Sequence, residues 1–295
     1  MRRLVKRKRM KIVGDNSRVI TLPHVPSKIP RINNIIKRVL KLSEADVADQ
    51  LEETFLLFAD RHRNLEQLLI RHYERVSQYV VKKETISNSQ KLLIGAYFTM
   101  EYSIESAALF NPSIVLHPDQ SLLPEGSVRF IMSLRATGEG HISSIVFRSG
   151  ILDKNMSLNF DSESEYVQTP QMVHDAFYDN NLFQLKLKDL KAWNETSSKI
   201  LNSLPEFFTH EELQKSIREV FLDTDFTPDS WTTTTIHWLA DSNYKIRFDE
   251  DTTLSGRVIF PVSANESKGI EDARFVKFTD EDDHITYYAT YTAYN

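Results

Sequence analysis

The chain contains no cysteine in its 295 residues. This absence excludes disulfide bonds, zinc sites built on thiolates and cysteine nucleophiles. Proteins without disulfides are typical of reducing compartments, so we predict a cytoplasmic protein. The chain also lacks any run of eighteen apolar residues, and no membrane-spanning helix is therefore expected.

Several common motifs are missing as well. The sequence has no Walker loop, no G-x-G-x-x-G, no G-x-S-x-G and no H-E-x-x-H, so it predicts no metal or cofactor site of these kinds. The formal net charge of −5 gives no reason to expect nucleic acid as a partner. Residues 1–11 are strongly basic, and we interpret them as a solvated arm, with contact to nucleic acid or an anionic surface as the alternative. No apolar core follows, so a secretory signal is not predicted.

The apolar content is ordinary for a globular protein. Hydrophobic residues make up 41% of the chain, which is enough for a real core in one large domain or two smaller ones. We expect a mixed α and β fold. An N-terminal arm and helical segment is predicted over residues 1–108, and a β-rich part over residues 109–295, with a helical insertion at about 164–222.

The N-terminal helices carry recognisable start signals. Ser43 is followed three residues later by Asp46, which is close to a capping box. Ser87 is the expected cap of a later helix that runs through Met100.

The insertion shows similar signals. Residues 172–177 and 182–187 carry mixed apolar stripes, which we interpret as helical. Thr209 is followed three residues later by Glu212, so another helix is predicted to begin there.

Short apolar or alternating runs predict strands joined by tight turns. They lie at residues 113–116, 128–134, 142–148, 231–238, 244–248, 257–261 and 287–291. Such spacing predicts antiparallel meanders, which are the units of sandwiches, barrels and propellers. The last strand is followed by no helix or tail, so we expect an unpaired edge and interpret the chain as a piece of a longer protein.

Two acidic turns stand out as candidate sites. Glu139 lies between Gly138 and Gly140, with Arg135 before it and His141 after it. Glycines allow a sharp turn and a close approach to a ligand. The plain alternative is a hairpin turn with a solvated glutamate.

The second turn contains Glu271, Asp272 and Arg274. In an extended strand Asp272 and Arg274 share a face, and Glu271 points the other way. Carboxylates beside a guanidinium can move protons and bind a polyhydroxylated substrate. The alternative is a charged strand edge. We predict that the two acidic turns meet across a single sugar-sized cleft.

Four segments together resemble a known family. They are Asn111-Pro112-Ser113, residues 134–144, residues 269–275 and residues 288–294. They are similar to glycoside hydrolase family 130, which contains phosphorylases and hydrolases of β-mannosides. The family pattern Gly-x-Glu-Asp-Pro-Arg has Ala273 here in place of proline. The resemblance implies a five-bladed β-propeller, of which this chain would hold only the first blades.

The resemblance also implies roles for individual residues. Glutamates at the positions of Glu139 and Glu271 resemble the hydrolytic members and are the implied catalytic pair. Substrate-binding roles are implied for Asn111, Arg135, His141, Asp272 and Arg274. The family inverts configuration, so the two carboxyl groups are expected roughly 6.5–9.5 Å apart.

The sequence leaves three functions open. The first is an inverting β-mannoside hydrolase, and its expected partner is a manno-oligosaccharide. The second is a mannoside phosphorylase with inorganic phosphate as co-substrate, for which Arg135, His141, Arg148 and Arg274 are candidate phosphate ligands. The third is a glycan-binding propeller without turnover. The oligomeric state is left open.

Overall fold

The computed structural model describes residues 10–81, 86–173 and 177–295. Its contacts divide the chain into two compact units. Unit 1 comprises Met1–Thr169, Thr252–Ile259 and Glu271–Tyr291, and unit 2 comprises Pro170–Asp251, Phe260–Ile270 and Thr292–Asn295. The predicted boundary near residue 108 stays a prediction.

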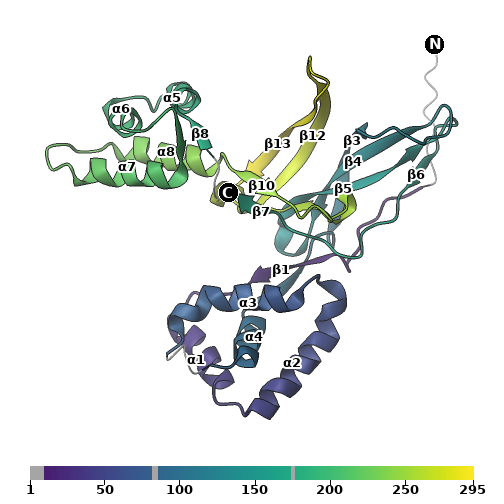
Figure 1. The fold of residues 1–295 in the computed structure, drawn as a ribbon, viewed down its shortest axis with the longest axis horizontal. Coiled ribbons are helices and arrows are strands. Elements are labelled where there is room, and N and C mark those ends of the chain that lie inside the picture. Colours follow the sequence, from purple (N-terminus) through teal and green to yellow (C-terminus); the bar gives the residue numbers. More distant parts are fainter. Residues whose placement is uncertain (1–9, 82–85, 174–176) are drawn as a thin grey trace. The chain divides into compact units, whose positions relative to one another are not determined.

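The mixed α and β character is confirmed. The helices of unit 1 are α1 (Ile29–Val39), α2 (Glu44–Phe58), α3 (Leu65–Val76) and α4 (Asn88–Tyr97). Its strands are β1 (Val19–Pro23), β2 (Thr99–Ser103), β3 (Ala108–Leu116), β4 (Val128–Thr137), β5 (Ser143–Leu152), β6 (Leu158–Phe160) and β11 (Val258–Ile259), together with most of β12 (Gly269–Thr279) and β13 (Ile285–Tyr294). Figure 1 shows α1–α4 grouped together and β3, β4 and β5 as neighbours. No sheet closes on itself among the described residues.

The helix starts predicted in unit 1 are confirmed. Ser43 accepts from the Asp46 backbone amide at 3.1 Å, and Asp46 accepts in return from the Ser43 amide at 3.3 Å. Ser87 forms the same reciprocal pair with Gln90. Each capping box satisfies amides that a helix start leaves without a partner.

The prediction that the helix beginning at Ser87 runs on through Met100 is wrong. The helix ends at Tyr97, and Thr99–Ser103 forms β2, which pairs with β1. The Thr99 hydroxyl donates to the Gly95 carbonyl at 2.8 Å and so satisfies one of the last carbonyls of the helix. Because α4 and α3 approach closely at Gly95, where a Cβ would lie 2.0 Å from the Leu69 carbonyl oxygen, the helix pair leaves no room for a larger residue.

His72 is a buried histidine of this helical core. Its side chain lies on α3, and the residue is only 6% exposed. Nδ1 lies 2.6 Å from the Thr99 hydroxyl oxygen. The hydroxyl proton is already donated to Gly95, so Nδ1 is the donor and carries the ring proton. Burial, and then the charges of Arg75 and Arg71, lower the pKa of His72 to about 4.

The chain is expected to lose stability as the pH falls from about 6.5 towards 4. An ordinary histidine titrates near 6.5, so over this range the unfolded chain takes up a proton at position 72 and the folded chain does not. The loss in free energy of unfolding is absent above the pKa that His72 has in the unfolded chain. It reaches roughly 2–3 kcal/mol near the pKa that His72 has in the folded chain. Urea denaturation of the wild type and of His72→Gln between pH 7.5 and 4.5 measures it. The variant should show a shallower fall, whereas identical slopes would contradict the assignment.

The meander predicted for the first β portion is confirmed. β3, β4 and β5 run antiparallel, with Arg135 opposite Ile145 and Thr137 opposite Ser143. Because side chains alternate along a strand, Arg135, Thr137, Ile145 and Ser143 share one face of the sheet. The β12–β13 hairpin approaches β3 as well, since the Tyr287 hydroxyl donates to the Leu116 carbonyl at 2.7 Å.

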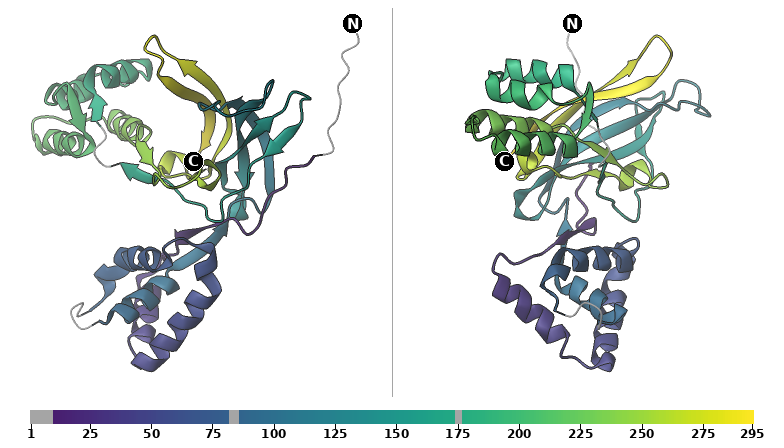
Figure 2. Two further views of the ribbon diagram at one scale, coloured as in Figure 1. Left: turned by 45° about the vertical axis from the view of Figure 1, so that its right-hand side comes forward. Right: turned by 60° about the vertical axis from the view of Figure 1, so that its left-hand side comes forward.

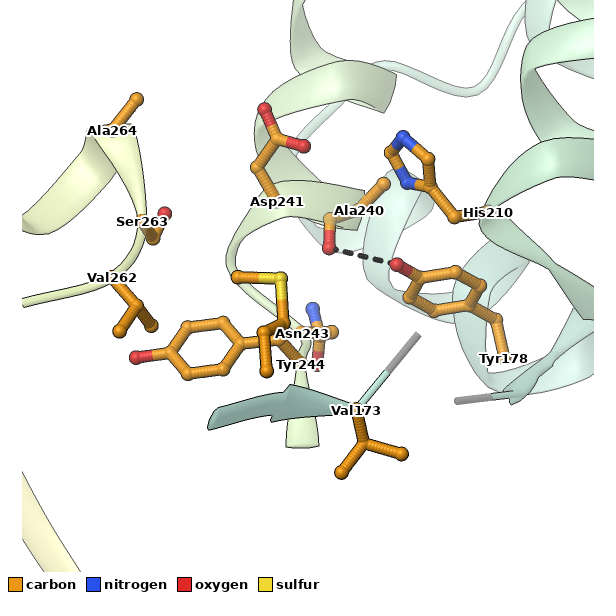
Figure 3. Close-up of a pocket in the computed structure, with 11 residues that line it drawn as sticks. Val173, Tyr178, His210, Ala240, Asp241, Asn243, Tyr244, Val262, Ser263 and Ala264 are labelled. Atoms are coloured by element: carbon orange, nitrogen blue, oxygen red, sulfur yellow. Dashed lines mark hydrogen bonds between the residues drawn. The ribbon is translucent and has the colours of Figure 1, made fainter. Parts of the chain in front are cut away.

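In its described residues, unit 2 contains the helices α5–α8 and four short strands. They are β7 (Gln171–Val173), β8 (Phe177–Asp179), α5 (Asn180–Asp189), α6 (Glu195–Asn202), β9 (Phe207–Thr209), α7 (His210–Leu222), α8 (Ser230–Asp241) and β10 (Lys245–Arg247). Figure 2 shows α5–α8 as a group of their own. Their apolar faces share a core that includes Phe183, Leu187, Phe208 and Leu213. The Tyr178 hydroxyl donates to the Ala240 carbonyl at 3.1 Å and joins β8 to α8 (Figure 3).

Predictions for unit 2 are confirmed in part. The helices over residues 182–187 and from Thr209 onward are present, the latter with its capping box to Glu212. Residues 171–173 form a strand and not a helix, and residues 174–176 lie outside the described residues. The predicted strand over residues 231–238 is helix α8, because Asp229 caps it and its apolar residues pack on the helical core.

Among the described residues, no helix is both long enough and apolar enough to cross a membrane.

Candidate functional site

The acidic turn at Glu271 and the strand end at Arg135 meet in unit 1. We call the side chains of Asn111, Arg135, Ser143, Glu271, Asp272 and Arg274 the carboxylate–arginine cluster. β4 supplies Arg135 two residues before its end, β5 begins with Ser143, and β12 carries the two carboxylates and Arg274 near its start. Residues 136 positions apart in the chain are thus joined through side chains.

Glu271 is the most enclosed carboxylate of the cluster. Its side chain is 15% exposed and forms an ion pair with the Arg135 guanidinium. The Ser143 hydroxyl donates to the same Glu271 oxygen at 3.2 Å, and Arg135 Nε donates to the Ser143 oxygen at 3.1 Å. The Arg135 guanidinium also lies over the Phe110 ring, 4.7 Å from its centre. These contacts fix the orientation of both charged groups.

Asp272 lies on the same side as Glu271, which corrects the prediction of opposite faces. Its Oδ1 accepts from the Asn111 side-chain amide and lies 3.6 Å from the Arg135 guanidinium. The reason is the backbone of Asp272, whose φ of 55° is left-handed and breaks the alternation of the strand. Arg274 then donates to the Asn111 carbonyl at 3.1 Å and closes the cluster.

Asn111 sits at a β-bulge. The β3–β4 register shifts between Phe110 and Ser113, and Asn111 has a φ of 52°. Pro112 has no N–H and cannot donate a hydrogen bond to the neighbouring strand. A bulge is a place where a proline is tolerated, because the regular pairing is interrupted there. Bulges re-aim side chains and are frequent next to active sites. Two left-handed residues, Asn111 and Asp272, therefore face each other across the cluster and hydrogen bond to each other.

Glu139 and His141 lie in the turn between β4 and β5. Glu139 lies two residues beyond Thr137, the last residue of β4, and His141 lies two residues before Ser143, the first residue of β5. Within the described part of the chain, neither side chain has a hydrogen bond or an ion pair with the cluster. Burial raises the pKa of Tyr102 to about 12, and the charge of Glu139 acts in the same direction.

Gly138 holds this turn close to Tyr102. A Cβ on Gly138 would lie 2.3 Å from the Ser103 carbonyl oxygen and 2.5 Å from the Tyr102 ring. The glycine is therefore required by packing. The Tyr102 hydroxyl in turn donates to the Ile142 carbonyl at 3.0 Å, which anchors the far side of the turn. Glu139 is thus an exposed carboxylate on an anchored turn, next to the cluster along the hairpin.

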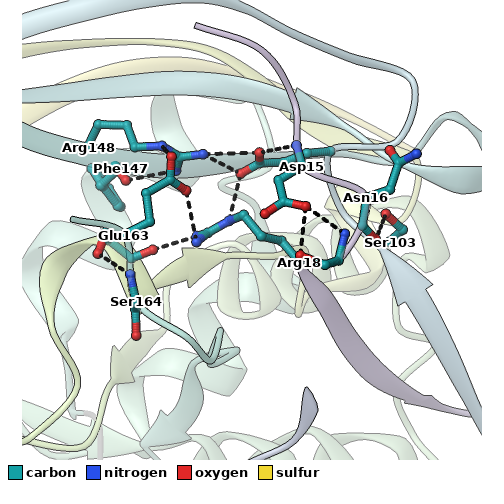
Figure 4. A network of polar contacts seen from close by, with 11 residues as sticks. Asp15, Asn16, Arg18, Ser103, Phe147, Arg148, Glu163 and Ser164 are labelled. Atoms are coloured by element: carbon teal, nitrogen blue, oxygen red, sulfur yellow. Dashed lines mark hydrogen bonds and ion pairs between the residues drawn. The ribbon is translucent and has the colours of Figure 1, made fainter. Parts of the chain in front are cut away.

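Arg148 does not belong to the cluster. It lies on β5 opposite Met132, and alternation places it on the other face of the sheet from Arg135. There it donates twice to Glu105, at 2.9 and 3.0 Å. Arg18 donates to the same carboxylate at 2.9 Å, and Glu163 contacts both arginines (Figure 4). The prediction that Arg148 binds phosphate is therefore wrong, because its guanidinium donates to a buried carboxylate.

The cluster can orient a hydroxylated substrate and exchange protons with it. It offers carboxylate oxygens, guanidinium donors and an amide within one group of contacts. Ser143 and Phe110 were not singled out from the sequence as site residues. The alternation of β5 could have identified Ser143, because it stands opposite Thr137 on the face of Arg135. Among the described residues no group of histidine, aspartate and glutamate side chains is arranged to hold a metal ion.

Comparison of the chain with protein-family models, with curated proteins and with solved structures finds no match in any of the three.

Proposed function

We propose that this chain is part of an inverting β-mannoside hydrolase of the glycoside hydrolase family 130 type. The proposal includes the five-bladed propeller, of which the β3–β4–β5 meander would form part of the first blade. Its main support is the contact of Glu271 with Arg135 and Ser143, which brings an acidic turn to a distant strand end. Such convergence is what a catalytic carboxylate requires and a merely charged strand edge does not.

The two carboxylates have different surroundings, and this favours different roles. Glu271 is held in place by an ion pair with Arg135 and a hydrogen bond from Ser143, and we assign it as the base that activates water. Glu139 has no hydrogen bond or ion pair within the described residues and lies on the neighbouring turn. It is the proton donor to the leaving oxygen in this proposal. An inverting reaction needs a water molecule between base and sugar, which requires separated carboxylates.

Hydrolysis is favoured over phosphorolysis by the positions of the arginines. Arg148 is withdrawn into a buried network, and Arg274 donates to the backbone of Asn111. Arg135 is paired with Glu271. Fewer arginine side chains are therefore available to bind a phosphate than the sequence indicated.

Incubation with β-1,2-mannobiose, with and without inorganic phosphate, tests the proposal. Proton NMR should show free mannose in both samples, with the α-anomer formed first. Mannose 1-phosphate that appears only with phosphate would replace the hydrolase by a phosphorylase. Saturation-transfer signals from mannobiose without any product would indicate a glycan-binding protein. Neither binding nor product would contradict the proposal altogether.

A further inference from the structure

Unit 2 contains a cavity of about 430 Å³ that is separate from the carboxylate–arginine cluster. It lies between the C-terminal end of α8, strands β7 and β8, and the segment at residues 262–264. Figure 3 shows Tyr178 and His210 on one side and Tyr244 and Val262 on the other. A volume of this size falls within the range of small-molecule sites.

The walls are largely apolar and aromatic. Side chains without polar hydrogens line much of the cavity, namely Met172, Val173, Ala240, Val262 and Ala264. Tyr178 and Tyr244 supply two aromatic rings. This lining suits a ligand with an apolar body and disfavours one that is polar on every side.

The hydrogen-bond donors of the lining are mostly used within the protein. The Tyr178 hydroxyl donates to the Ala240 carbonyl at 3.1 Å, and the Tyr244 hydroxyl donates to buried Glu266 at 2.6 Å. The Asn243 amide donates to the Leu239 carbonyl at 2.7 Å. The oxygens of these side chains can still accept hydrogen bonds from a ligand. The cavity therefore suits a ligand that donates hydrogen bonds.

Asp241 gives the cavity its charge. It is the last residue of α8, and its carboxylate has no hydrogen bond or ion pair within the described part of the chain. Its negative charge reaches the cavity, since it helps to raise the pKa of Tyr178 after the larger effect of burial. Among the described lining residues it is the one carboxylate, and the other ionisable side chains are those of His210 and the two tyrosines. An anionic ligand is therefore disfavoured, and a cation is favoured by both Asp241 and the tyrosine rings.

We propose that this cavity binds a small organic ammonium ion, in which a protonated amine is attached to an apolar body of about ring size. The ammonium group donates to Asp241 and to the Asn243 side-chain oxygen. The apolar body packs against Met172 and Val262, between the two tyrosines. This inference does not depend on the mannoside proposal, because none of its residues belongs to the carboxylate–arginine cluster.

Cyclohexylammonium and cyclohexanol are a matched pair of probes for the full chain. Both contain a cyclohexane ring, but the first carries a charged ammonium group and the second a neutral hydroxyl. Isothermal titration should give an affinity for cyclohexylammonium about tenfold or more above that for cyclohexanol. With ¹³C-methyl methionine, the Met172 signal should shift on addition of the amine, and the Met132 signal of unit 1 should not.

Asp241→Asn should weaken cyclohexylammonium binding about tenfold and leave cyclohexanol unaffected. Asp189→Asn is the matched control, since it removes the same charge from the end of α5, outside the cavity lining. Both residues are exposed, so both variants should fold, and circular dichroism checks this. Equal binding of the two probes, equal effects of the two variants, or no binding of either probe would each overturn the proposal.

Discussion

Replacing Glu271 by glutamine is expected to lower the rate of mannobiose hydrolysis by about 10²–10⁴-fold. This is the usual contribution of a general acid or base, and Glu271 is the base of the proposed mechanism. Glutamine keeps the size of the side chain and one oxygen that can accept from Arg135 and Ser143, so the cluster should stay in place. The loss should therefore appear in kcat and not in KM alone.

Glu281→Gln is the control for this variant. Glu281 lies between β12 and β13, is exposed, and carries the same charge at the opposite end of the hairpin. Its replacement should leave the rate within about twofold, as expected of a surface change away from the reacting groups. If Glu271→Gln raises KM with kcat intact, Glu271 binds substrate and is not the base. If both variants behave like the wild type, the catalytic assignment fails.

Removal of the Glu105 side chain is expected to have the largest effect on stability, about 3–5 kcal/mol for Glu105→Ala. The Glu105 side chain is wholly buried, and those of Arg18 and Arg148 are 4% and 3% exposed. Without Glu105 the two guanidinium groups would face each other in a site that water scarcely reaches. Burial already lowers the pKa of Arg18, which shows how poorly the charged form is solvated there. Urea denaturation at pH 7 measures the loss.

Glu163→Ala separates this explanation from a general sensitivity of the region. Glu163 contacts the same two arginines, but its side chain is 42% exposed, so water can take its place. We expect a loss of at most about 1 kcal/mol. Glu105→Gln should fall between the two, because it keeps hydrogen bonds and loses the charge. Equal stabilities of Glu105→Ala and Glu163→Ala would contradict the role of burial.

The sequence predicted well those features that depend on neighbouring residues. The caps at Ser43, Ser87 and Thr209 were correct, because each is decided by a side chain within three positions of the amide it accepts from. The β3–β4–β5 meander was correct because alternation and short turns are local as well. The helix at residues 231–238 was missed, since tryptophan and threonine favour strands and the burial that decides otherwise is tertiary.

The candidate site was predicted in composition but not in arrangement. Arg135 and Glu271 were named from two turns, and the structure joins them. The left-handed backbone of Asp272 could not be deduced, because a non-glycine residue in that region is uncommon. The place of Arg148 depends on Glu105, 43 residues away, and no local pattern indicates such a partner.

The partners of Arg18 have a consequence for the order in which the chain folds. This arginine donates to Glu105, 87 positions later, and to the carbonyl of Ser255, 237 positions later. On a ribosome, α1–α4 can pack as soon as residues 29–97 have emerged, because their contacts are near in sequence. The segment that precedes them can pair with β2 and reach Glu105 once residue 105 has emerged, but the bond from Arg18 to the Ser255 carbonyl must wait until residue 255 has been synthesised. Completion of the Arg18 contacts is thus a later event than the packing of the helices, and slow synthesis prolongs the time for which one of its donors stays hydrated.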